Sequence, residues 1–299
     1  MARAVNGNDH APIEVRGPLT GDRAATVAGA DSQPISGLLI GSALAPGVQR
    51  LTVTAPGERP WIDLTLAWLA RLGVRVQRDG YTHFVVPEQS VWSGFDYTVP
   101  GDWSSAAFPL VAALLTQSSV ELTGLWPDEQ GDQQLLAVLR SMGAKLTYDA
   151  EAGSLCVLPS GQLQGRCIDI NAMIDALPIL AVVGCFARGK TELTGAAVAR
   201  LKESDRIQTM CAALRQMGAV CGETADGLWV QESRLHWAQC DSANDHRIAL
   251  ALACAGLAAD GVRITRADCI AKTFADFVPL MQQMGAQVEW NDVTDTFWA

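Results

Sequence analysis

The stretch MGAKLTYD, residues 142–149, decides the fold class, because the chain repeats its pattern at three other places. In each copy a helical pattern ends in a glycine and a short strand pattern follows; the glycines are Gly73, Gly143, Gly218 and Gly285. Glycine at this point stops a helix in the left-handed conformation and turns the chain. A recurrence of about 70 residues predicts one supersecondary unit that the chain uses several times.

The segments between these glycines alternate between helical and strand patterns. In the third unit we expect a helix at 172–187, a strand at 191–195, a helix at 204–217 and then two more strands. This order predicts a mixed α/β (α+β) protein built from repeated βαβαββ units. Only short strand-like pieces precede the first helix, near Ser32, so we expect the first unit to have its end but not its beginning.

The composition argues against several classes of protein. The formal net charge of −10 disfavours nucleic-acid binding, because phosphate contacts need a basic surface. Eight cysteines without a CxxC pair are typical of buried thiols in a reducing cytoplasm, not of a disulfide or zinc framework. No apolar run approaches the roughly 20 residues of a membrane span. We therefore expect a cytoplasmic protein that binds neither nucleic acid nor a membrane.

One segment imitates a nucleotide-binding loop. GCFARGKT, residues 184–191, satisfies the P-loop pattern, but a P-loop follows a strand and leads into a helix. Here an alanine- and leucine-rich run precedes the segment, and a strand pattern follows it. We therefore expect a buried helix, a turn at 188–190 and a strand, without a nucleotide site.

Several predicted helices begin with polar and charged residues. Ser32 is the expected cap of the first helix, and Thr273 and Asp276 have the spacing of a capping box. Capping explains such Ser, Thr, Asp and Asn residues, but lysine and arginine oppose the helix dipole at this end. Their presence favours a bound anion. The motifs that contain these cations are KESDR at 202–206, NDHR at 244–247 and KT at 272–273.

The run that follows NDHR is almost purely apolar. Residues 248–259 read IALALACAGLAA, which predicts a helix that is buried all round. A rigid, buried helix would hold the charged residues at its start in a fixed position.

LKESDR (201–206), NDHR (244–247) and AKTF (271–274), in this order, resemble the motifs of the 5-enolpyruvylshikimate-3-phosphate synthase family. DSQPISGLL and DINAMIDALPIL are similar to the same family. The resemblance implies an inside-out α/β barrel of two domains, each of three repeats, with helix N-termini facing a cleft. It makes 1–100 the C-terminal part of an incomplete first domain and 101–299 a near-complete second domain.

The resemblance also implies an activity. Members of the family are transferases that move the enolpyruvyl group of phosphoenolpyruvate to the 5-hydroxyl of shikimate 3-phosphate and release phosphate. The reaction belongs to the shikimate pathway, which leads to chorismate and the aromatic amino acids. Family members need no metal or other cofactor and are commonly monomeric, so we expect a monomer for a full-length protein.

Two carboxylates match the catalytic residues of the family. Asp175 corresponds to the base near the 5-hydroxyl, and Glu203 corresponds to the carboxylate that transfers a proton to the methylene carbon. Each has a simpler interpretation: Asp175 could cap the helix at 176–187, and Glu203 could be a solvated partner of Lys202. His246 could serve only to brace its neighbours by hydrogen bonding.

The remaining site residues also follow from the motif match. Planar guanidinium groups suit the carboxylate and phosphate of phosphoenolpyruvate. The resemblance assigns shikimate 3-phosphate to Ser32, Gln33, Asp175 and Lys202, assigns phosphoenolpyruvate to Gln33, Arg206, Arg247 and Lys272, and gives Asp245 and His246 a supporting role.

The sequence departs from the family in two respects. Asp31 and Glu58 stand where the family usually has serine, and a carboxylate would repel a substrate phosphate unless Arg59 faces that phosphate instead. The N-terminal third of the family has no counterpart in the sequence, so we expect a fragment with little or no activity alone. Two alternatives stay open: a UDP-N-acetylglucosamine enolpyruvyl transferase, which shares the architecture, and a non-catalytic ligand-binding fragment.

Overall fold

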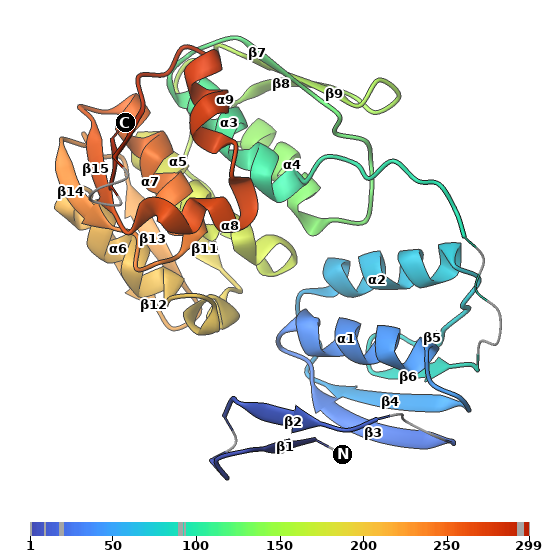
Figure 1. The fold of residues 1–299 in the computed structure, drawn as a ribbon. Coiled ribbons are helices and arrows are strands. Elements are labelled where there is room, and N and C mark those ends of the chain that lie inside the picture. Colours follow the sequence, from blue (N-terminus) through green and yellow to red (C-terminus); the bar gives the residue numbers. More distant parts are fainter. Residues whose placement is uncertain are drawn as a thin grey trace. The chain divides into compact units, whose positions relative to one another are not determined.

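The computed structural model of the protein describes residues 2–8, 10–17, 21–88, 92, 94–291 and 296–298 (Figure 1). Contacts within the chain divide it into two units: unit 1 is Met1–Tyr97 and unit 2 is Thr98–Ala299. Each unit has its own hydrophobic core. Helices and strands alternate in both, which confirms the mixed α/β class. Within the described ranges, every helix is too short or too polar to cross a membrane.

Unit 1 contains a complete βαβαββ unit and a separate hairpin. The main sheet has the strand order β3-β4-β6-β5; β3 and β4 are parallel, and the other pairs are antiparallel. Side chains such as Ile35, Leu39 and Ile62 form the core between helices and sheet. The elements are β1 (Ala2–Ala4), β2 (Ile13–Val15), β3 (Arg23–Ala28), α1 (Ser32–Ala43), β4 (Gln49–Thr54), α2 (Arg59–Arg71), β5 (Gln77–Asp79) and β6 (His83–Val86).

Strand β3 supplies a beginning for the first unit, so the prediction that this unit lacks one is wrong. The sequence of β3, RAATVA, shows no alternation of apolar and polar residues, because β3 lies at the edge of the sheet and most of its side chains are exposed. What defines it as a strand is its parallel register with β4, in which Val27 pairs with Val53. The alternation of residue types in the sequence does not predict the pairing of β3 with β4.

Unit 2 contains three repeats. The first comprises α3 (Trp103–Leu115), β7 (Val120–Thr123), η1 (Gly131–Gln134, 3₁₀), α4 (Leu135–Ser141), β8 (Lys145–Asp149) and β9 (Ser154–Leu158). The second comprises β10 (Cys167–Asp169), η2 (Asn171–Ala176, 3₁₀), α5 (Leu177–Phe186), β11 (Lys190–Thr194), η3 (Ala197–Leu201, 3₁₀), α6 (Arg206–Gln216), β12 (Cys221–Thr224) and β13 (Gly227–Gln231). The third comprises β14 (Ala238–Asp241), α7 (His246–Ala258), β15 (Val262–Thr265), η4 (Ala267–Ile270, 3₁₀), α8 (Ala271–Phe274), α9 (Phe277–Gln283), β16 (Glu289–Asn291) and β17 (Thr296–Trp298).

The sheets of unit 2 repeat the topology seen in unit 1. Their orders are β10-β11-β13-β12 and β14-β15-β17-β16, and in each the first two strands are parallel. The first repeat forms a three-stranded sheet, β7-β9-β8, among the described residues. The recurrence of about 70 residues in the sequence is therefore a recurrence of one sheet topology.

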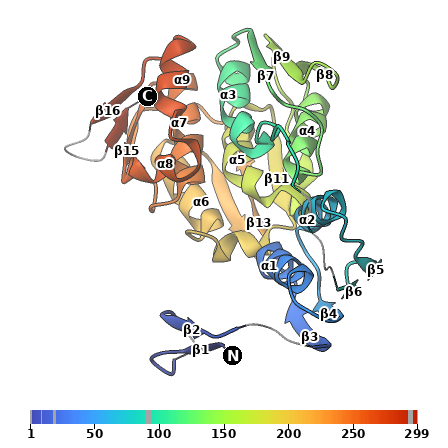
Figure 2. The same ribbon diagram turned by 45° about the vertical axis from the view of Figure 1, so that its right-hand side comes forward.

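Three helices, α3, α5 and α7, pack on one another in the middle of unit 2. Figures 1 and 2 show the sheet of β7, β8 and β9 and the pair β14–β15 on opposite sides of them. Every residue from Ile248 to Gly256 in α7 is buried, which confirms the prediction of a helix without a solvent-exposed face. The start of α7 is consequently fixed by the core of the unit.

The glycines that define the repeat end helices, as predicted. Gly73, Gly143, Gly218 and Gly285 all have positive φ angles, between 87° and 106°. A residue with a Cβ would be strained in this conformation, so glycine ends each helix with the least backbone strain. The P-loop-like segment also has its predicted structure: α5 ends at Phe186 and β11 begins at Lys190.

Some predicted helix boundaries are wrong for local reasons. The segment predicted as a helix at 172–187 begins as a 3₁₀ turn, because Met173 leaves helical geometry and Pro178 favours the first turn of a new helix. Asp31, and not Ser32, caps α1 by accepting a hydrogen bond from the Gln33 amide. The expected capping box at Thr273 is absent, since that residue lies inside the short helix α8.

Candidate active site

Charged side chains from four elements of unit 2 meet at the starts of α6 and α7. Helix α6 follows strand β11 and helix α7 follows strand β14, and a hydrogen bond from Arg206 to Asp245 joins the two helix starts. The carboxylate of Asp205 accepts a hydrogen bond from the Gln208 amide at 3.0 Å and caps α6. The carboxylate of Asp245 accepts one from the Arg247 amide at 3.0 Å and caps α7. Capping therefore fixes the positions of the arginines at both starts.

Arg206 lies at the centre of this cluster and is 1% exposed. Its Nε donates to Asp245 at 2.8 Å, its Nη1 to Asp175 at 2.7 Å, and its Nη2 to Glu203 at 2.7 Å and to Asp245 at 3.3 Å. Four of the five guanidinium N–H groups are thus committed to carboxylates. Arg206 mainly holds these three acids together, and one N–H on Nη1 takes part in no hydrogen bond among the described residues.

Arg247 connects the cluster to the start of α3. Its Nη2 lies 2.8 Å from Asp175 Oδ2 and donates to the Ser104 hydroxyl at 3.0 Å. Ser104 in turn donates to Asp102, which caps α3. The described hydrogen bonds of the Arg247 side chain all come from Nη2, so Nε and Nη1 keep N–H donors, on different edges of the guanidinium, for the oxygens of an anion.

Glu203 and Lys272 form the more accessible side of the cluster. Lys272 Nζ donates to Glu203 Oε1 at 2.7 Å, and the lysine side chain is 56% exposed. Burial raises the pKa of Glu203, but Lys272 and Arg206 outweigh burial and lower it to about 2. Glu203 is therefore ionised near neutral pH as long as both cations stay in place.

The pKa of Asp175 is also shifted. Burial raises it, but the charges of Arg247 and Arg206 and a contribution from Lys202 hold it below the ordinary value. Asp175 does not cap α5, whose cap position is Ala176, so the simpler interpretation of this residue is wrong. Its carboxylate bridges the two arginines instead.

His246 is buried beside these groups. Its Nδ1 has no hydrogen-bond partner in the described part of the chain and lies 4.0 Å from Glu203 Oε1. Burial, followed by the charge of Arg247, lowers the pKa of His246, so the imidazole is neutral near pH 7. Nδ1 therefore makes no bracing hydrogen bond to a described residue, and the bracing role of His246 stays a prediction.

Asp132, which the sequence reasoning missed, is a further acid of this region. It lies in η1, which packs against η2 and α3, and it is 2% exposed with Oδ2 unpartnered among the described residues. Burial raises the pKa of Asp132 to about 7; the negative charges of Asp175 and Asp102 add to the rise, and Arg247 opposes it. Asp132 follows no motif and caps no long helix, so only the fold reveals its burial.

The raised pKa of Asp132 predicts a specific pH dependence of stability. Between pH 4 and about 7 the unfolded chain loses this proton while the folded chain keeps it, so rising pH favours unfolding. Asp132→Asn removes that cost. We expect its stability advantage over the native chain to grow by roughly 2–4 kcal/mol from pH 4 to pH 8.

Urea unfolding of the native chain and of Asp132→Asn at several pH values measures this difference. Asp260→Asn, an exposed change in the same unit, serves as the control and should leave the pH dependence unchanged. A difference between Asp132→Asn and the native chain that stays constant from pH 4 to pH 8 would show that folding does not raise the pKa of Asp132.

Comparison with known proteins identifies the family to which the chain belongs. The family model described as EPSP synthase (3-phosphoshikimate 1-carboxyvinyltransferase) matches residues 2–281. The chain belongs to the EPSP synthase family. This confirms the resemblance that the three charged motifs indicate.

Curated EPSP synthases match almost the whole chain. The 3-phosphoshikimate 1-carboxyvinyltransferase of Acetivibrio thermocellus is 39% identical over 289 residues, which are 96% of this chain and 67% of that protein. The enzyme of the same name from Chlamydia pneumoniae is 42% identical over 292 residues, 96% of this chain and 64% of that protein. The chain thus spans about two thirds of the length of these relatives.

Solved structures agree with this assignment. An EPSP synthase from Acinetobacter baumannii is 28% identical with a TM-score of 0.78, and the match covers 95% of this chain and 67% of that one. The enolpyruvyl transferase NikO from Streptomyces tendae shares the fold, with a TM-score of 0.69 at 18% identity over 92% of this chain and 66% of that one. The enolpyruvyl transferase fold is therefore shared by this chain, as the resemblance implied.

The predicted EPSP synthase site residues fall into two sets. One set meets in the cluster of unit 2, and the other, Ser32 and Gln33, lies at the start of α1 in unit 1. There the Ser32 amide and hydroxyl both donate to Glu58. The residues in the cluster of unit 2 are Asp175, Lys202, Glu203, Arg206, Asp245, His246, Arg247 and Lys272.

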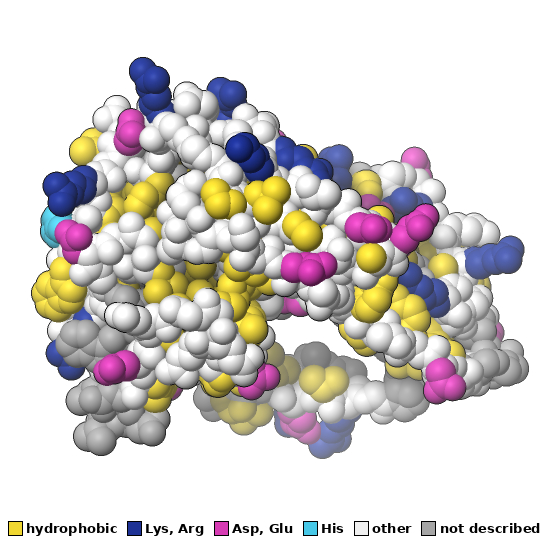
Figure 3. All heavy atoms as spheres, turned by 90° about the horizontal axis from the view of Figure 1, so that it is seen from above, with side chains coloured by type: hydrophobic (Ala, Val, Ile, Leu, Met, Phe, Trp, Pro, Cys, Tyr) yellow, Lys and Arg dark blue, Asp and Glu magenta, His cyan; other side chains and the backbone are white. Residues whose placement is uncertain are grey.

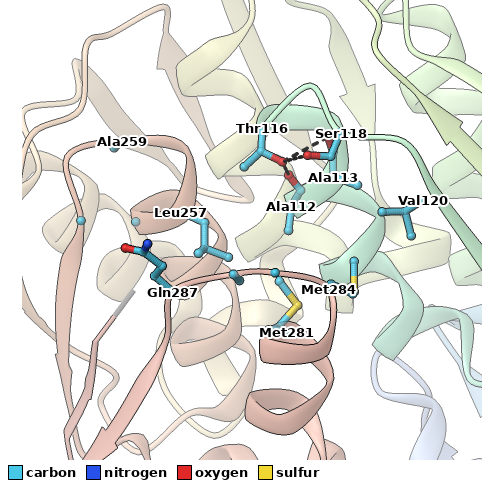
Figure 4. Close-up of a pocket in the computed structure, with 14 residues that line it drawn as sticks. Ala112, Ala113, Thr116, Ser118, Val120, Leu257, Ala259, Met281, Met284 and Gln287 are labelled. Atoms are coloured by element: carbon cyan, nitrogen blue, oxygen red, sulfur yellow. Dashed lines mark hydrogen bonds between the residues drawn. The ribbon is translucent and has the colours of Figure 1, made fainter.

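A cavity of about 470 Å³ lies elsewhere in unit 2. It is lined by the C-terminal ends of α3 and α7 and by α9, with Thr116, Met281 and Gln287 among its residues (Figure 4). None of its lining residues is titratable, so it offers no acid, base or cation for the chemistry of an EPSP synthase. It lies at the ends of α3 and α7 opposite to the charged cluster.

The surface charges and the possible metal ligands of the described residues were also compared with the expectations from the sequence. On the face in Figure 3, acidic and basic side chains are interspersed, and no broad basic patch gathers there. Within the described ranges, no group of three or more His, Cys, Asp or Glu side chains is arranged to hold a metal ion.

Proposed function

We propose that unit 2 provides the phosphoenolpyruvate-binding and proton-transfer groups of an EPSP synthase reaction. The reaction transfers the enolpyruvyl group to the 5-hydroxyl of shikimate 3-phosphate and releases phosphate, on the route to chorismate and the aromatic amino acids. The observation that carries this proposal is the convergence of Arg206, Arg247 and Lys272 with Asp175 and Glu203 at the starts of two rigid helices. Family membership favours this reaction over the UDP-N-acetylglucosamine alternative.

The cations differ in what they offer an incoming anion. Lys272 is exposed, so its ammonium can move from Glu203 to a ligand phosphate, while Arg247 has N–H groups on Nε and Nη1 that no described hydrogen bond uses. Arg206 has only one such N–H. We assign direct contact with phosphoenolpyruvate chiefly to Arg247 and Lys272, and a mainly organising role to Arg206.

The shifted pKa of Glu203 suggests how its proton is supplied. With a pKa of about 2 in the cluster as it stands, Glu203 holds almost no proton near pH 7. An anion that draws Lys272 away removes one of the groups that lower this pKa, which then rises. Binding of phosphoenolpyruvate thereby prepares Glu203 to carry the proton that the methylene carbon needs.

Asp175 is the candidate for the opposite proton transfer. Its carboxylate would take the proton of the 5-hydroxyl as the oxygen bonds to the central carbon of the enolpyruvyl group, while Glu203 protonates the methylene carbon. Departure of phosphate, with return of a methyl proton to Glu203, restores the double bond.

Ser32, Gln33 and Lys202 remain proposed contacts of shikimate 3-phosphate, and Gln33 is also a proposed contact of phosphoenolpyruvate. A monomeric, cytoplasmic full-length protein is the corresponding proposal for its assembly and location.

A phosphate-release assay with both substrates tests the role of Glu203. Glu203→Gln keeps the shape of the side chain but cannot carry the proton, so we expect the rate to fall by about 100-fold or more. Glu232→Gln, an exposed change after β13, is the matched control and should keep the native rate. A measurable rate of the native chain that Glu203→Gln matches would exclude Glu203 as the proton carrier.

Calorimetry gives a second readout, because we expect a low rate from this chain alone. Binding of phosphoenolpyruvate should become tighter when shikimate 3-phosphate is present. If each substrate binds but neither affects the other and no phosphate is released, the chain is a non-catalytic ligand-binding protein. If neither substrate binds, the proposed function is wrong.

A further inference from the structure

The cavity of about 470 Å³ lies at a boundary between two repeats of unit 2. Its walls are the ends of α3 and α7, the segments that lead into β7 and β15, and the turn after α9 (Figure 4). Because α3, α5 and α7 all contact one another, the three repeats meet at three boundaries. The cavity marks the boundary between the third repeat and the first, and described segments of the chain occupy the other two.

At each of these two occupied boundaries, a connecting segment carries a leucine into the core. Leu163 is 3% exposed, and the amide of the next residue donates to the Met142 carbonyl after α4 at 2.8 Å. Leu235 is also 3% exposed, and the amide of the next residue donates to the Met217 carbonyl after α6 at 2.9 Å. Each segment continues into a strand, β10 or β14, that runs parallel to β11 or β15. A buried leucine and one backbone hydrogen bond therefore precede a parallel strand at both boundaries.

The third boundary has the same framework but, among the described residues, no such segment. Met284 follows α9 as Met142 follows α4 and Met217 follows α6, and a glycine with a positive φ comes after each methionine. Met142 and Met217 are fully buried, whereas Met284 is only partly buried and lines the cavity. No described donor reaches the Met284 carbonyl. The cavity is therefore the place that a leucine of a connecting segment occupies at the other two boundaries.

The sheet beside the cavity differs from the others at the corresponding position. Three sheets of the protein have four strands, and in each the first strand runs parallel to the second. In β7-β9-β8, no described strand pairs with the other edge of β7. The Gly101 amide donates to the Gly124 carbonyl just beyond β7 at 2.7 Å, but residues 94–100 form no strand. Such an edge keeps backbone N–H and C=O groups with which a further strand can pair.

We propose that the cavity and the free edge of β7 together bind an extended segment of a separate polypeptide chain. The segment places a leucine-sized apolar side chain in the cavity, donates its next amide to the Met284 carbonyl and then pairs with β7 as a parallel strand. The two described segments of this form, 162–170 and 234–242, already occupy the other boundaries, so a second copy of the chain has neither to give. The site lies at the ends of α3 and α7 opposite to the charged cluster, so its occupation does not depend on the proposed function.

A labelled peptide with the sequence of residues 162–170, QLQGRCIDI, is the probe, since this segment fills an equivalent boundary. Under reducing conditions we expect its fluorescence anisotropy to rise saturably on titration with the full chain. The same peptide with Leu163→Asp should bind at least about tenfold more weakly, because the cavity offers a carboxylate no cation. Ala286→Trp, which fills the cavity from a partly buried position, should weaken binding of the native peptide by a similar factor. Ala152→Trp, an exposed change between β8 and β9, is the matched control and should bind like the native chain.

Methyl NMR of the methionines locates the bound peptide. The signals of Met281 and Met284 should shift, while those of Met142 and Met217, at the occupied boundaries, should not. The proposal is overturned if the native peptide does not bind, if the Leu163→Asp peptide binds as tightly, or if Met142 shifts in place of Met284. In sedimentation velocity we expect the native chain to stay monomeric. A dimer that the peptide dissociates would assign the cavity to a second copy and overturn the choice of a separate chain.

Discussion

Replacing Arg206 by methionine is expected to destabilise unit 2 by roughly 3–5 kcal/mol, since it leaves buried carboxylates without their cation. Arg206 donates to Asp175, Glu203 and Asp245, and Asp245 is itself fully buried. Methionine fills a similar volume, so the loss reports the charge and the hydrogen bonds more than a cavity. Urea unfolding at pH 7, followed by far-ultraviolet circular dichroism, measures the change.

Arg215→Met is the matched control for this experiment. It makes the same substitution at the other end of the same helix, where Arg215 is exposed and its described hydrogen bonds all go to the Cys221 carbonyl. Its expected cost is about 1 kcal/mol. Arg206→Lys should fall between the two, because an ammonium cannot bridge three carboxylates in a plane. Equal stabilities for Arg206→Met and Arg215→Met would contradict a central structural role for Arg206.

Replacing Arg247 by methionine is expected to weaken phosphoenolpyruvate binding by about 100-fold. Nε and Nη1 of Arg247, which no described hydrogen bond uses, lie on different edges of the guanidinium, so each can donate one charge-assisted hydrogen bond to a different anionic oxygen. Hydrogen bonds to charged groups contribute about 1.5–3 kcal/mol each, so a loss of about 3 kcal/mol is a conservative expectation. The change also removes a cation that offsets the charge of Asp175.

Calorimetric titration of phosphoenolpyruvate in the presence of shikimate 3-phosphate measures this effect. Arg215→Met again provides the control, as it removes the same charge from a position outside the cluster. We expect the control to bind like the native chain. Native affinity in a folded Arg247→Met variant would mean that the anion is held by other groups, and Lys272 would be the next residue to test.

Local patterns in the sequence predicted most of the fold. The glycines that end helices, the alternation of helices and strands and the apolar run of α7 each depend on residues close together in the chain. Strand β3 could not be recognised in this way, because it is an exposed edge strand defined by its pairing with β4. The cap of α1 was misassigned for a related reason: Asp31 and Ser32 are both good capping residues, and the backbone at Asp31 decides between them.

For the candidate site, too, local motifs predicted some features and the three-dimensional packing determined the others. Motifs pointed to the residues at helix starts, and eight of these converge in unit 2. The sequence could not indicate how they share hydrogen bonds, and therefore not that Arg206 is nearly saturated while Arg247 is not. Asp132 could not be predicted in this way. Its burial results from the packing of η1 against η2 and α3, and no motif or helical pattern in the sequence indicates that packing.

Six charged groups of the cluster in unit 2 form ion pairs with one another, and Lys202 is a further cation whose charge acts on Asp175. Arg206, Arg247 and Lys272 face Asp175, Glu203 and Asp245, three positive groups against three negative ones. These ion pairs compensate the buried charges of the cluster. They also mean that an incoming anion must compete with the protein's own carboxylates for each cation. Part of the anion's intrinsic attraction is therefore spent on breaking internal ion pairs, and the same rearrangement frees carboxylates to move protons.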